Sequence, residues 1–573
     1  MTPETFLENF NQLAGTPGAV KRLRELILQL AVTGKLVSQD PNDEPASVLL
    51  KKIAAEKARL VREGKIRKSE PLPPIKPEDV PFELPEGWEW VRLGNIGTVG
   101  SSSRVHQRDW SDQGIPFYRA REIVKLSQNG FVDNELFISE DLYQSLSSNG
   151  IMPEEDDIML TGVGTIGVPY VVRKDDRFYF KDASVLILKN HFNLFSTYLQ
   201  YFFQSPYWVN DIHKESMGTT VHTLTIVRAN SVLLPFPPDA EQRRIVARVD
   251  QLMALCDRLE EREVQAKETH NALTKSTLYV LTTADGSHAF QTAWQRIRDQ
   301  FSHLFINPES VKELRQTILQ LAVMGKLVPQ DPNDEPASVL LKKIAAEKAR
   351  LVREGKIKKS EPLPPIKPEE VPFELPERWE WCRLGMLGNV KGGGTPSKQR
   401  PEYWEGDIPW ISPKDMKVDF ISDSIDHING SALDDSSVKM IEKGAMLMVV
   451  RGMILDHSFP VAITLTAVTI NQDMKALELY CNSSQKYILL TFKGNLDRFL
   501  ALVQRSSHGT CRVDSEKLFS LAIPIPPLTE QHRIVACVDQ LMALCDRLEE
   551  QLQKTKTEGV QLMEAAIHHL SAA

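Results

Sequence analysis

Hydrophobic positions recur at helical spacing near the start of the chain. Steps of three and four residues place them on one face of a helix, and they are Val20, Leu23, Leu26, Ile27 and Leu30. We expect this helix over about residues 19–37, with Gly34 near its end, where a glycine tolerates the C-terminal turn. A second amphipathic helix is expected after Pro45, and Gly64 closes it.

A proline-rich stretch follows the second helix. Five prolines fall between Pro71 and Pro81, so we expect an extended, semi-rigid segment rather than a flexible tether. It leads to the aromatic sequence Trp88-Glu-Trp90. A stiff segment of this kind sets a distance between the parts that it joins.

Short apolar runs punctuated by glycines dominate the next part of the chain. Runs at 158–161, 167–172 and 183–188 predict strands. Helices are expected at about 196–204 and, further on, at about 484–491. This mixture predicts an α+β class for each of the two regions concerned.

A long helix is expected after each of these regions. In the first one, apolar residues follow a heptad-like spacing, at Ile245, Val249, Leu252, Leu255 and Leu259. We expect it to run to about Leu281 and the second to about Leu570, so each is about 40 residues or near 60 Å long. The two helices are expected to pack antiparallel; the alternative is that each packs on its own α+β region.

The chain repeats itself around two unlike inserts. Leu23–Gly97 returns as Leu314–Gly388, and within it residues 39–66 and 330–357 are identical. Glu241–Glu261 returns as Glu530–Glu550 with two differences. The inserts between these blocks are barely alike. We therefore predict two globular α+β domains separated by long antiparallel helices, with an internal pseudo-two-fold repeat that offers one surface to two copies of a partner.

The repeat divides the chain into segments in a fixed order. They are an N-terminal helical region (1–68), a proline-rich linker (69–97), the first insert (98–240), the first long helix (241–285), a central helical region (286–359), a second linker (360–388), the second insert (389–529) and the second long helix (530–573).

Composition narrows the class of protein. The 573 residues are 42% hydrophobic and 25% charged, which is ordinary for a globular protein. No apolar run approaches the roughly 18–20 residues of a membrane span, and the first residues show no signal pattern, so we expect a cytoplasmic protein. The six cysteines form no Cys-x-x-Cys pair, and we expect Cys256 and Cys545 to be small buried hydrophobes.

Net charge bears on nucleic acid as a partner. The chain carries −8, and the inserts carry about −5 and −1 by sequence count. Neither insert is a basic domain. If DNA is the partner, we expect another subunit to supply much of the phosphate neutralisation.

Motifs for catalysis are missing from the sequence. There is no phosphate loop, no Asn/Asp-Pro-Pro-Tyr/Phe turn of adenine methyltransferases, no nucleophile elbow and no His-Glu-x-x-His helix. Residues 162–167 read Gly-x-Gly-x-x-Gly, but a strand follows them, so we expect a tight turn. Glu154–Asp157 is the densest run of carboxylates; without a nearby lysine in sequence, we interpret it as a solvated turn.

Two motifs flanking each insert carry a family resemblance. Trp-Glu-Trp-x-Arg-Leu-Gly at 88–94 and 379–385 precedes the inserts, and Pro-x-Pro-Pro-x-x-Glu-Gln-x-Arg-Ile-Val at 235–246 and 524–535 follows them. The order resembles the specificity subunits of type I restriction–modification systems. Gly393–Ser397 and Pro401–Trp410 are similar to the family's target-recognition opening, whereas the first insert keeps only Ser101–Ser103 and Gly114–Phe117.

The resemblance implies a division of labour. The chain would be non-catalytic, and each insert would be a target-recognition domain that reads one half of a bipartite, asymmetric site in double-stranded DNA. The repeated helices would dock two adenine-N6 methyltransferase subunits, and restriction–translocase subunits would join for cleavage. S-adenosylmethionine, ATP and Mg²⁺ would then be bound by the partners and no cofactor by this chain, with no membrane involved.

Candidate contact residues follow from the chemistry of base edges, which favours arginine, lysine, asparagine, glutamine and small hydroxyls. The DNA-binding candidates of the first insert are Arg104, His106, Gln107, Arg108, Arg119, Arg121, Thr219, Thr220 and His222. Those of the second insert are Lys398, Gln399, Arg400, Lys414, Arg451, Arg505, Ser506, His508 and Arg512. For each one alone, a phosphate contact or a surface ion pair is the main alternative.

Partner-binding candidates lie on the repeated long helices. They are Gln242, Arg244, Asp250 and Arg258 with their repeat mates Gln531, Arg533, Asp539 and Arg547. Trp88, Trp90, Trp379 and Trp381 are expected to be core anchors rather than stacking platforms for bases.

Two other functions compete with this hypothesis. A coiled-coil scaffold that binds two identical protein clients without DNA specificity fits the acidic charge. A stand-alone nuclease or methyltransferase is disfavoured by the missing motifs. Sequence-specific DNA binding in the presence of the methyltransferase would separate the specificity subunit from the scaffold. Methylation of DNA by the chain alone would support the stand-alone enzyme.

Overall fold

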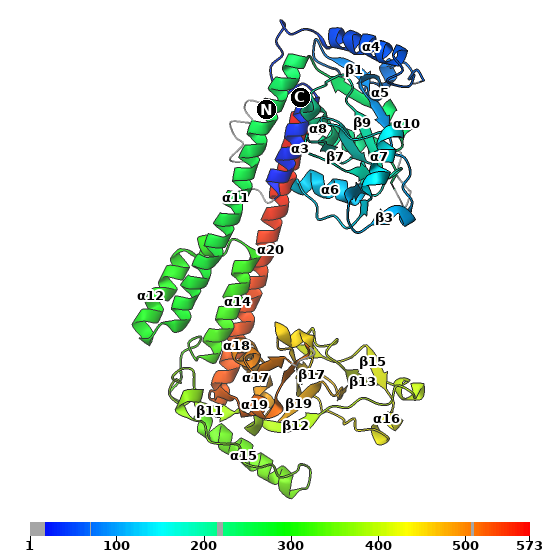
Figure 1. The fold of residues 1–573 in the computed structure, drawn as a ribbon. Coiled ribbons are helices and arrows are strands. Elements are labelled where there is room, and N and C mark those ends of the chain that lie inside the picture. Colours follow the sequence, from blue (N-terminus) through cyan, green and yellow to red (C-terminus); the bar gives the residue numbers. More distant parts are fainter. Residues whose placement is uncertain (1–17, 69, 215–221, 506–508, 573) are drawn as a thin grey trace. The chain divides into compact units, whose positions relative to one another are not determined.

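A computed structural model describes residues 18–68, 70–214, 222–505 and 509–572 (Figure 1). The chain forms two compact units, of which unit 1 comprises residues 1–266 and 555–573 and unit 2 residues 267–554. Both predicted long helices are confirmed, as α11 (Asp239–Thr283) and α20 (Leu528–Ala572), each 45 residues long. Helix α11 begins in unit 1 and ends in unit 2, and α20 leads back from unit 2 into unit 1.

Unit 1 combines short strands with helices on their faces. Before α11 its elements are α3 (Ala19–Val32), α4 (Ala46–Arg62), η1 (Pro77–Asp79), β1 (Glu89–Arg92), α5 (Leu93–Ile96), β2 (Thr98–Gly100), η2 (Gln107–Asp109), β3 (Trp110–Ser111), β4 (Ile115–Tyr118), α6 (Ala120–Asn129), β5 (Phe137–Ile138), α7 (Glu140–Asn149), β6 (Ile158–Thr161), β7 (Pro169–Val171), β8 (Tyr179–Phe180), β9 (Val185–Lys189), α8 (Ser196–Gln204), α9 (Pro206–His213), α10 (Ile226–Ser231) and β10 (Leu233–Phe236).

Unit 2 has the same repeated helices and flanking strands around a different insert. Before α20 its elements are α12 (Gly286–Asp299), α13 (Phe301–Leu304), α14 (Pro308–Val323), α15 (Ala337–Arg353), η4 (Pro368–Glu370), β11 (Glu380–Arg383), η5 (Leu384–Met386), β12 (Gly388–Gly392), η6 (Pro401–Trp404), β13 (Ile408–Ile411), β14 (Phe420–Ile421), β15 (Asp426–Ile428), α16 (Gly430–Asp434), β16 (Met446–Val449), η7 (Met453–Asp456), β17 (Val461–Thr464), β18 (Thr469–Ile470), β19 (Met474–Leu479), η8 (Asn482–Ser484), α17 (Gln485–Gly494), α18 (Leu496–Leu500), β20 (Val503–Arg505), β21 (Cys511–Val513), α19 (Ser515–Ser520) and β22 (Ala522–Ile525).

The first helix is shorter than its hydrophobic pattern predicts. Helix α3 ends at Val32 instead of about residue 37, because Gly34 adopts a left-handed conformation with φ +71°. A Cβ at Gly34 would lie 2.3 Å from Cγ of Pro85, so the linker packs directly on this turn. Helix α4 ends as predicted beside Gly64, which is also left-handed at φ +68°.

The main sheets of the two inserts share one topology. Unit 1 has the strand order β2-β9-β6-β7, and unit 2 has β12-β19-β16-β17 with β14 added at the edge. The neighbours within the shared order pair antiparallel. The predicted strands at 158–161, 167–172 and 183–188 are confirmed as β6, β7 and β9, and helix α8 has the predicted bounds.

A two-stranded ladder closes the base of each insert. Strand β1 pairs with β10 so that Arg92 lies opposite Leu233, and β11 pairs with β22 so that Arg383 lies opposite Ala522. The two ladders have the same register. A buried tyrosine also bonds to each closing strand: the hydroxyl of Tyr198 donates to Pro235 O at 2.9 Å, and that of Tyr487 donates to Pro524 O at 3.0 Å.

The acidic run of the first insert is a turn with Glu154, Glu155 and Asp156 exposed, as expected, but its last carboxylate, Asp157, is buried. Lys189 Nζ lies 2.6 Å from Oδ2 of Asp157 and 2.5 Å from Oε2 of Glu154, and both Lys189 and Asp157 are buried. The lysine is 32 residues from Asp157 in sequence, on the neighbouring strand β9. Sheet pairing therefore supplies the partner that sequence proximity does not reveal.

Candidate functional site

The repeated blocks around each insert, 23–97 with 241–261 and 314–388 with 530–550, are called the frame here. The frame makes the same contacts twice. In unit 1, the indole of Trp88 and the amide of Gln39 both donate to the carboxylate of Glu241, at 3.0 and 3.1 Å. In unit 2, Trp379 and Gln330 donate to Glu530 at 3.1 Å each. Burial raises the pKa of both glutamates, and these hydrogen bonds partly offset it. Trp88 and Trp379 are buried, as predicted, and Trp90 and Trp381 are only partly buried.

Repeated ion pairs join the short helices to the long ones. Arg24 on α3 contacts Asp257 and Glu260 on α11, each at 2.7 Å. Its repeat mate Arg315 contacts Asp546 and Glu549 on α20 at 2.6 and 3.1 Å. The near-identical sequences thus build near-identical local structures.

Most partner-binding candidates on these helices have internal roles. Gln242 and Gln531 are buried and donate to Pro237 O and Pro526 O, each at 3.0 Å. Arg244 and Arg533 form ion pairs with Asp43 and Asp334, each at 2.6 Å. Asp250 accepts a hydrogen bond from Tyr201, and Lys486 lies 4.0 Å from Asp539. These side chains hold the frame together.

Arg258 and Arg547 are the remaining pair of partner-binding candidates. Both are exposed on the long helices, two residues after the buried Cys256 and Cys545. Burial raises the pKa of each of these thiols, to about 11 for Cys256, as is typical of small buried hydrophobes. Each long helix therefore carries an exposed arginine at the same position of the repeat.

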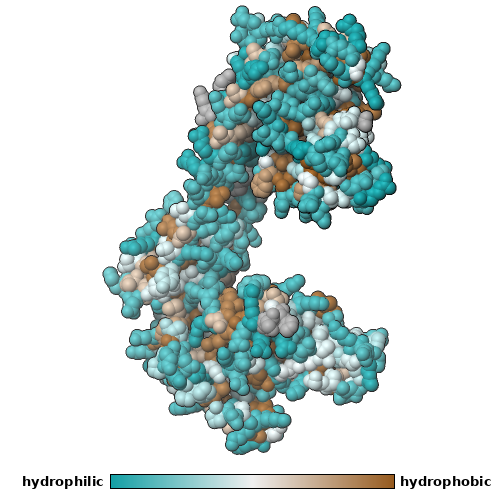
Figure 2. All heavy atoms as spheres, viewed as in Figure 1, coloured by the Kyte–Doolittle hydropathy of each residue, from teal (hydrophilic) through white to brown (hydrophobic). Residues whose placement is uncertain are grey.

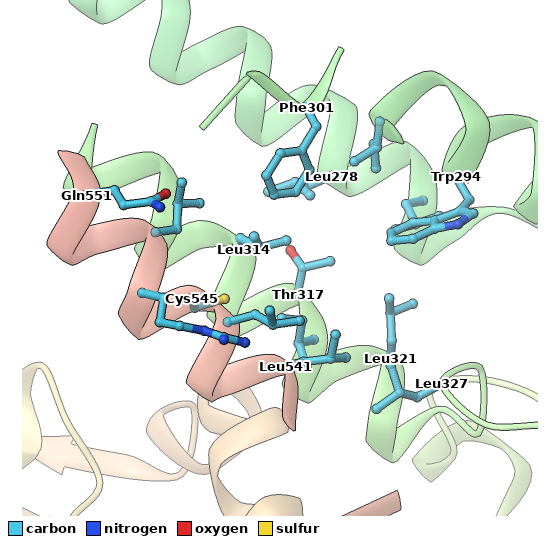
Figure 3. A pocket seen from close by; sticks show the side chains of 16 residues that line it. Leu278, Trp294, Phe301, Leu314, Thr317, Leu321, Leu327, Leu541, Cys545 and Gln551 are labelled. Atoms are coloured by element: carbon cyan, nitrogen blue, oxygen red, sulfur yellow. The ribbon is translucent and has the colours of Figure 1, made fainter. Parts of the chain in front are cut away.

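A mostly apolar cavity of about 510 Å³ lies beside Arg547 in unit 2. Figure 3 shows Leu541 and Cys545 of α20 next to Leu314 and Leu321 of α14, with the side chains of Leu278, Phe301 and Trp294 facing them. Three of its lining side chains are 40–50% exposed: Trp294, Phe301 and Leu544. On the face shown in Figure 2, hydrophilic side chains predominate and hydrophobic ones lie in small groups.

The DNA-binding candidates of the first insert differ in exposure and in their partners. Arg104, His106, Gln107 and Arg108 are exposed around η2. Arg119 and Arg121 instead bind the buried Glu122; although burial opposes its charge, hydrogen bonds from both arginines hold the pKa of Glu122 below its usual value. Thr219 and Thr220 lie outside the described residues. The ring of His222 stacks edge-on against His213 at 5.1 Å.

Candidates in the second insert are more exposed. Lys398, Gln399 and Lys414 lie on the surface, and Arg400 packs over the ring of Tyr403 at 5.3 Å. Arg505 forms an ion pair with Asp456. Arg451 and Arg512 are exposed, and the structure pairs them across an isolated β-bridge. Ser506 and His508 lie outside the described residues.

This bridge identifies equivalent positions in the two unlike inserts. In unit 2, Gly452 N–H donates to Cys511 O at 2.9 Å, and Val513 N–H donates to Val450 O at 2.8 Å. In unit 1, Gly164 N–H donates to His222 O at 3.3 Å, and Leu224 N–H donates to Gly162 O at 2.8 Å. Both pairs of bonds flank a bridge that follows an equivalent strand, β16 or β6.

The bridge pairs therefore correspond to each other: Arg451 with Arg512 in unit 2, and Val163 with Thr223 in unit 1. Sequence reasoning found the two arginines but missed Val163 and Thr223. No residue type marked these two, since Val163 lies in a segment interpreted only as a tight turn. That turn is confirmed, with Gly164 and Gly167 at φ +79° and +77° and strand β7 following.

Two negative findings apply to the described part of the chain. Among these residues, no group of three or more histidine, cysteine, aspartate or glutamate side chains is arranged to hold a metal ion. Within the same residues, no helix is both long and apolar enough to cross a membrane.

Comparison with known proteins gives a consistent result over most of the chain. The family model of the type I restriction modification DNA specificity domain matches residues 85–267 and again 376–555. The EcoAI specificity subunit of Escherichia coli is 35% identical over 576 residues, covering 95% of this chain and 93% of the relative. The EcoEI specificity subunit of the same species is 34% identical over 572 residues, with the same two coverages.

A solved structure of the HsdS subunit from Thermoanaerobacter tengcongensis is 18% identical, covers 86% of this chain and 98% of its own, and has a TM-score of 0.37. The family match occurs twice, once over each α+β insert with its closing ladder, as the predicted repeat requires. Together with the two full-length relatives, this repeated match shows that the chain belongs to the specificity subunits of type I restriction–modification systems.

Proposed function

We propose that each insert reads one half of a bipartite, asymmetric DNA site, and that the repeated helices dock two adenine-N6 methyltransferase subunits. Specificity subunits are not catalytic, so methyl transfer and cleavage belong to the partners. S-adenosylmethionine, ATP and Mg²⁺ are accordingly proposed to bind to methyltransferase and restriction subunits rather than to this chain.

The two β-bridges carry the recognition part of this proposal. The same backbone hydrogen bonds present Val163 and Thr223 in one insert and Arg451 and Arg512 in the other. A shared backbone with different side chains is what two readers of unlike half-sites require, because base identity is read by side chains at base edges.

The repeated frame supports the docking part. Arg258 and Arg547 occupy equivalent exposed positions on long helices that are otherwise almost identical over 21 residues, 241–261 and 530–550. Two copies of one partner can therefore meet the same exposed side chains on each long helix.

The decisive experiment expresses this chain with its methyltransferase partner in a host free of adenine methylation. Genomic N6-methyladenine is then mapped by single-molecule sequencing. A split motif, with two unlike half-sites and a fixed unspecified gap, supports the proposal. If both proteins are soluble and associated but no methylation appears, the scaffold alternative is favoured instead.

A further inference from the structure

Arg451 and Arg512 belong to a row of three polar side chains across adjacent strands. Arg512 lies opposite Gln504 in the hairpin β20–β21, and opposite Arg451 in the isolated bridge. Directly opposed residues of antiparallel strands project to the same side of the ladder, with their Cβ atoms about 4.5–5.5 Å apart. All three side chains are exposed.

The charge of this row is largely uncompensated among the described residues. Asp473 lies 4.0 Å from Arg451, at the limit of an ion pair, and none of the carboxylates that the structure describes forms an ion pair with Arg512. Arg505, the neighbour of Gln504 in sequence, instead pairs with Asp456. Because side chains alternate along a strand, Arg505 projects from the opposite face of the hairpin.

Two like charges directly opposite each other destabilise a sheet. The fold does not need them, since unit 1 builds the same bridge from Val163 and Thr223 without any charge. An unfavourable pair of cations at a position where the equivalent insert has none indicates a ligand that repays the cost. Arginine side chains of this kind fit the O6 and N7 acceptors of guanine.

We infer that Arg451 and Arg512 read guanine in the half-site of the second insert, and that Val163 and Thr223 occupy the equivalent reading position for the first half-site. The inference rests on the proposed function. The first pair selects guanine through hydrogen bonds to its major-groove edge. The second pair offers a methyl-bearing surface that suits the 5-methyl group of thymine, and it cannot make the arginine contacts.

The test uses the complex of this chain with its methyltransferase subunits and duplexes that carry the split motif. Each guanine of the second half-site is replaced in turn by 7-deazaguanine, which lacks the N7 acceptor. We expect one or two replacements to weaken binding by about 5- to 150-fold in the native complex. In Arg512→Gln or Arg451→Gln, the native site should bind correspondingly less tightly, and the matching replacement should have no further effect.

Lys517→Gln is the matched control, since it removes one positive charge from an exposed position on α19, five residues after Arg512. It should leave the discrimination between guanine and 7-deazaguanine unchanged. Penalties for base changes in the first half-site should be unaffected in all three variants. If a glutamine variant does not assemble, the 7-deazaguanine series in the native complex decides the question alone.

Three outcomes would overturn the inference. They are a second half-site without guanine, insensitivity of the native complex to 7-deazaguanine, or variants that bind all sequences equally less well with a salt dependence reduced by about one phosphate contact. A split motif with any of these results refutes only the arginine assignment. The lack of any split motif refutes the proposed function as well.

Discussion

The indole nitrogen of Trp88 donates a hydrogen bond to Glu241 at 3.0 Å, across 153 residues of chain. This bond joins the residue just before strand β1 to the first turn of the long helix that follows the first insert. Both side chains are buried. Trp379 and Glu530 form the same bond in unit 2 at 3.1 Å.

Loss of this acceptor is expected to destabilise the frame of unit 1. Glu241→Ala leaves the buried indole N–H unsatisfied, so the free energy of unfolding in a guanidinium titration should fall by about 1–3 kcal/mol. Glu241→Gln keeps an acceptor oxygen and should have a smaller effect. Glu263→Ala, at an exposed position further along α11, is the control. Equal effects of the two alanine variants would contradict the importance of the bond.

The ion pair between Glu370 in the second linker and Arg383 on β11 is expected to weaken in acid. Hydrogen bonds from Arg383 and from the backbone of Lys367 lower the pKa of Glu370 from 4.5 to about 2. Since the folded value is the lower one, the stabilisation is present above about pH 4.5 and is lost as the pH falls towards 2. The glutamate is partly exposed, so solvent screening limits the size of the effect.

Glu370→Gln tests this pH dependence. The unfolding free energies of native protein and variant should differ at pH 7, and the difference should shrink as the pH falls from about 4.5 to 2. Glu369→Gln, at the exposed neighbouring position, serves as the control. A difference that stays constant over this range would refute the assigned role of the Glu370–Arg383 pair.

Two left-handed glycines should respond differently to the same substitution. Gly64→Ala meets no atom within 4 Å, so it should cost only the backbone strain of about 1–2 kcal/mol. Gly34→Ala adds a Cβ 2.3 Å from Pro85 Cγ and should cost distinctly more in the free energy of unfolding. Similar losses for both variants, measured by denaturant unfolding, would show that the linker yields easily at this turn.

Charge reversal on the long helices is expected to reduce the number of bound methyltransferase subunits. Native mass spectrometry should find two subunits on the native chain, one on Arg258→Glu or Arg547→Glu, and none on the double variant. Arg248→Glu is the matched control, because the repeat mate of Arg248 is Cys537 and this position is not shared between the halves. Two bound subunits on the double variant would place the docking surface elsewhere.

Sequence patterns predict the frame better than they predict which positions of the two inserts correspond. The helical spacing from Val20 to Leu30 and the stripe from Ile245 to Leu259 have local causes, so sequence predicts α3 and α11, apart from the end of α3, which the left-handed Gly34 sets. The partnership of Lys189 with Asp157 depends on strand pairing over 32 residues, which periodicity does not encode.

The equivalence of Val163 and Arg451 was hidden for a different reason. It rests on backbone hydrogen bonds from Gly164 and Gly452, which form whatever the side chains are. Residue types at the two bridges share no chemistry, so no pattern aligned them. Arg451 and Arg512 were predicted as separate candidates, and only the bridge shows that they stand side by side.

The ladders at the base of each insert attach two unlike domains to the frame in the same way. Because Arg92 pairs with Leu233 and Arg383 with Ala522 in the same register, each insert leaves and rejoins the frame at adjacent points of equal geometry. A foreign domain with the same spacing between its ends could therefore be spliced in without disturbing the helices. Under the proposed function, recombination between genes could then supply new target sequences while the docking helices stay unchanged.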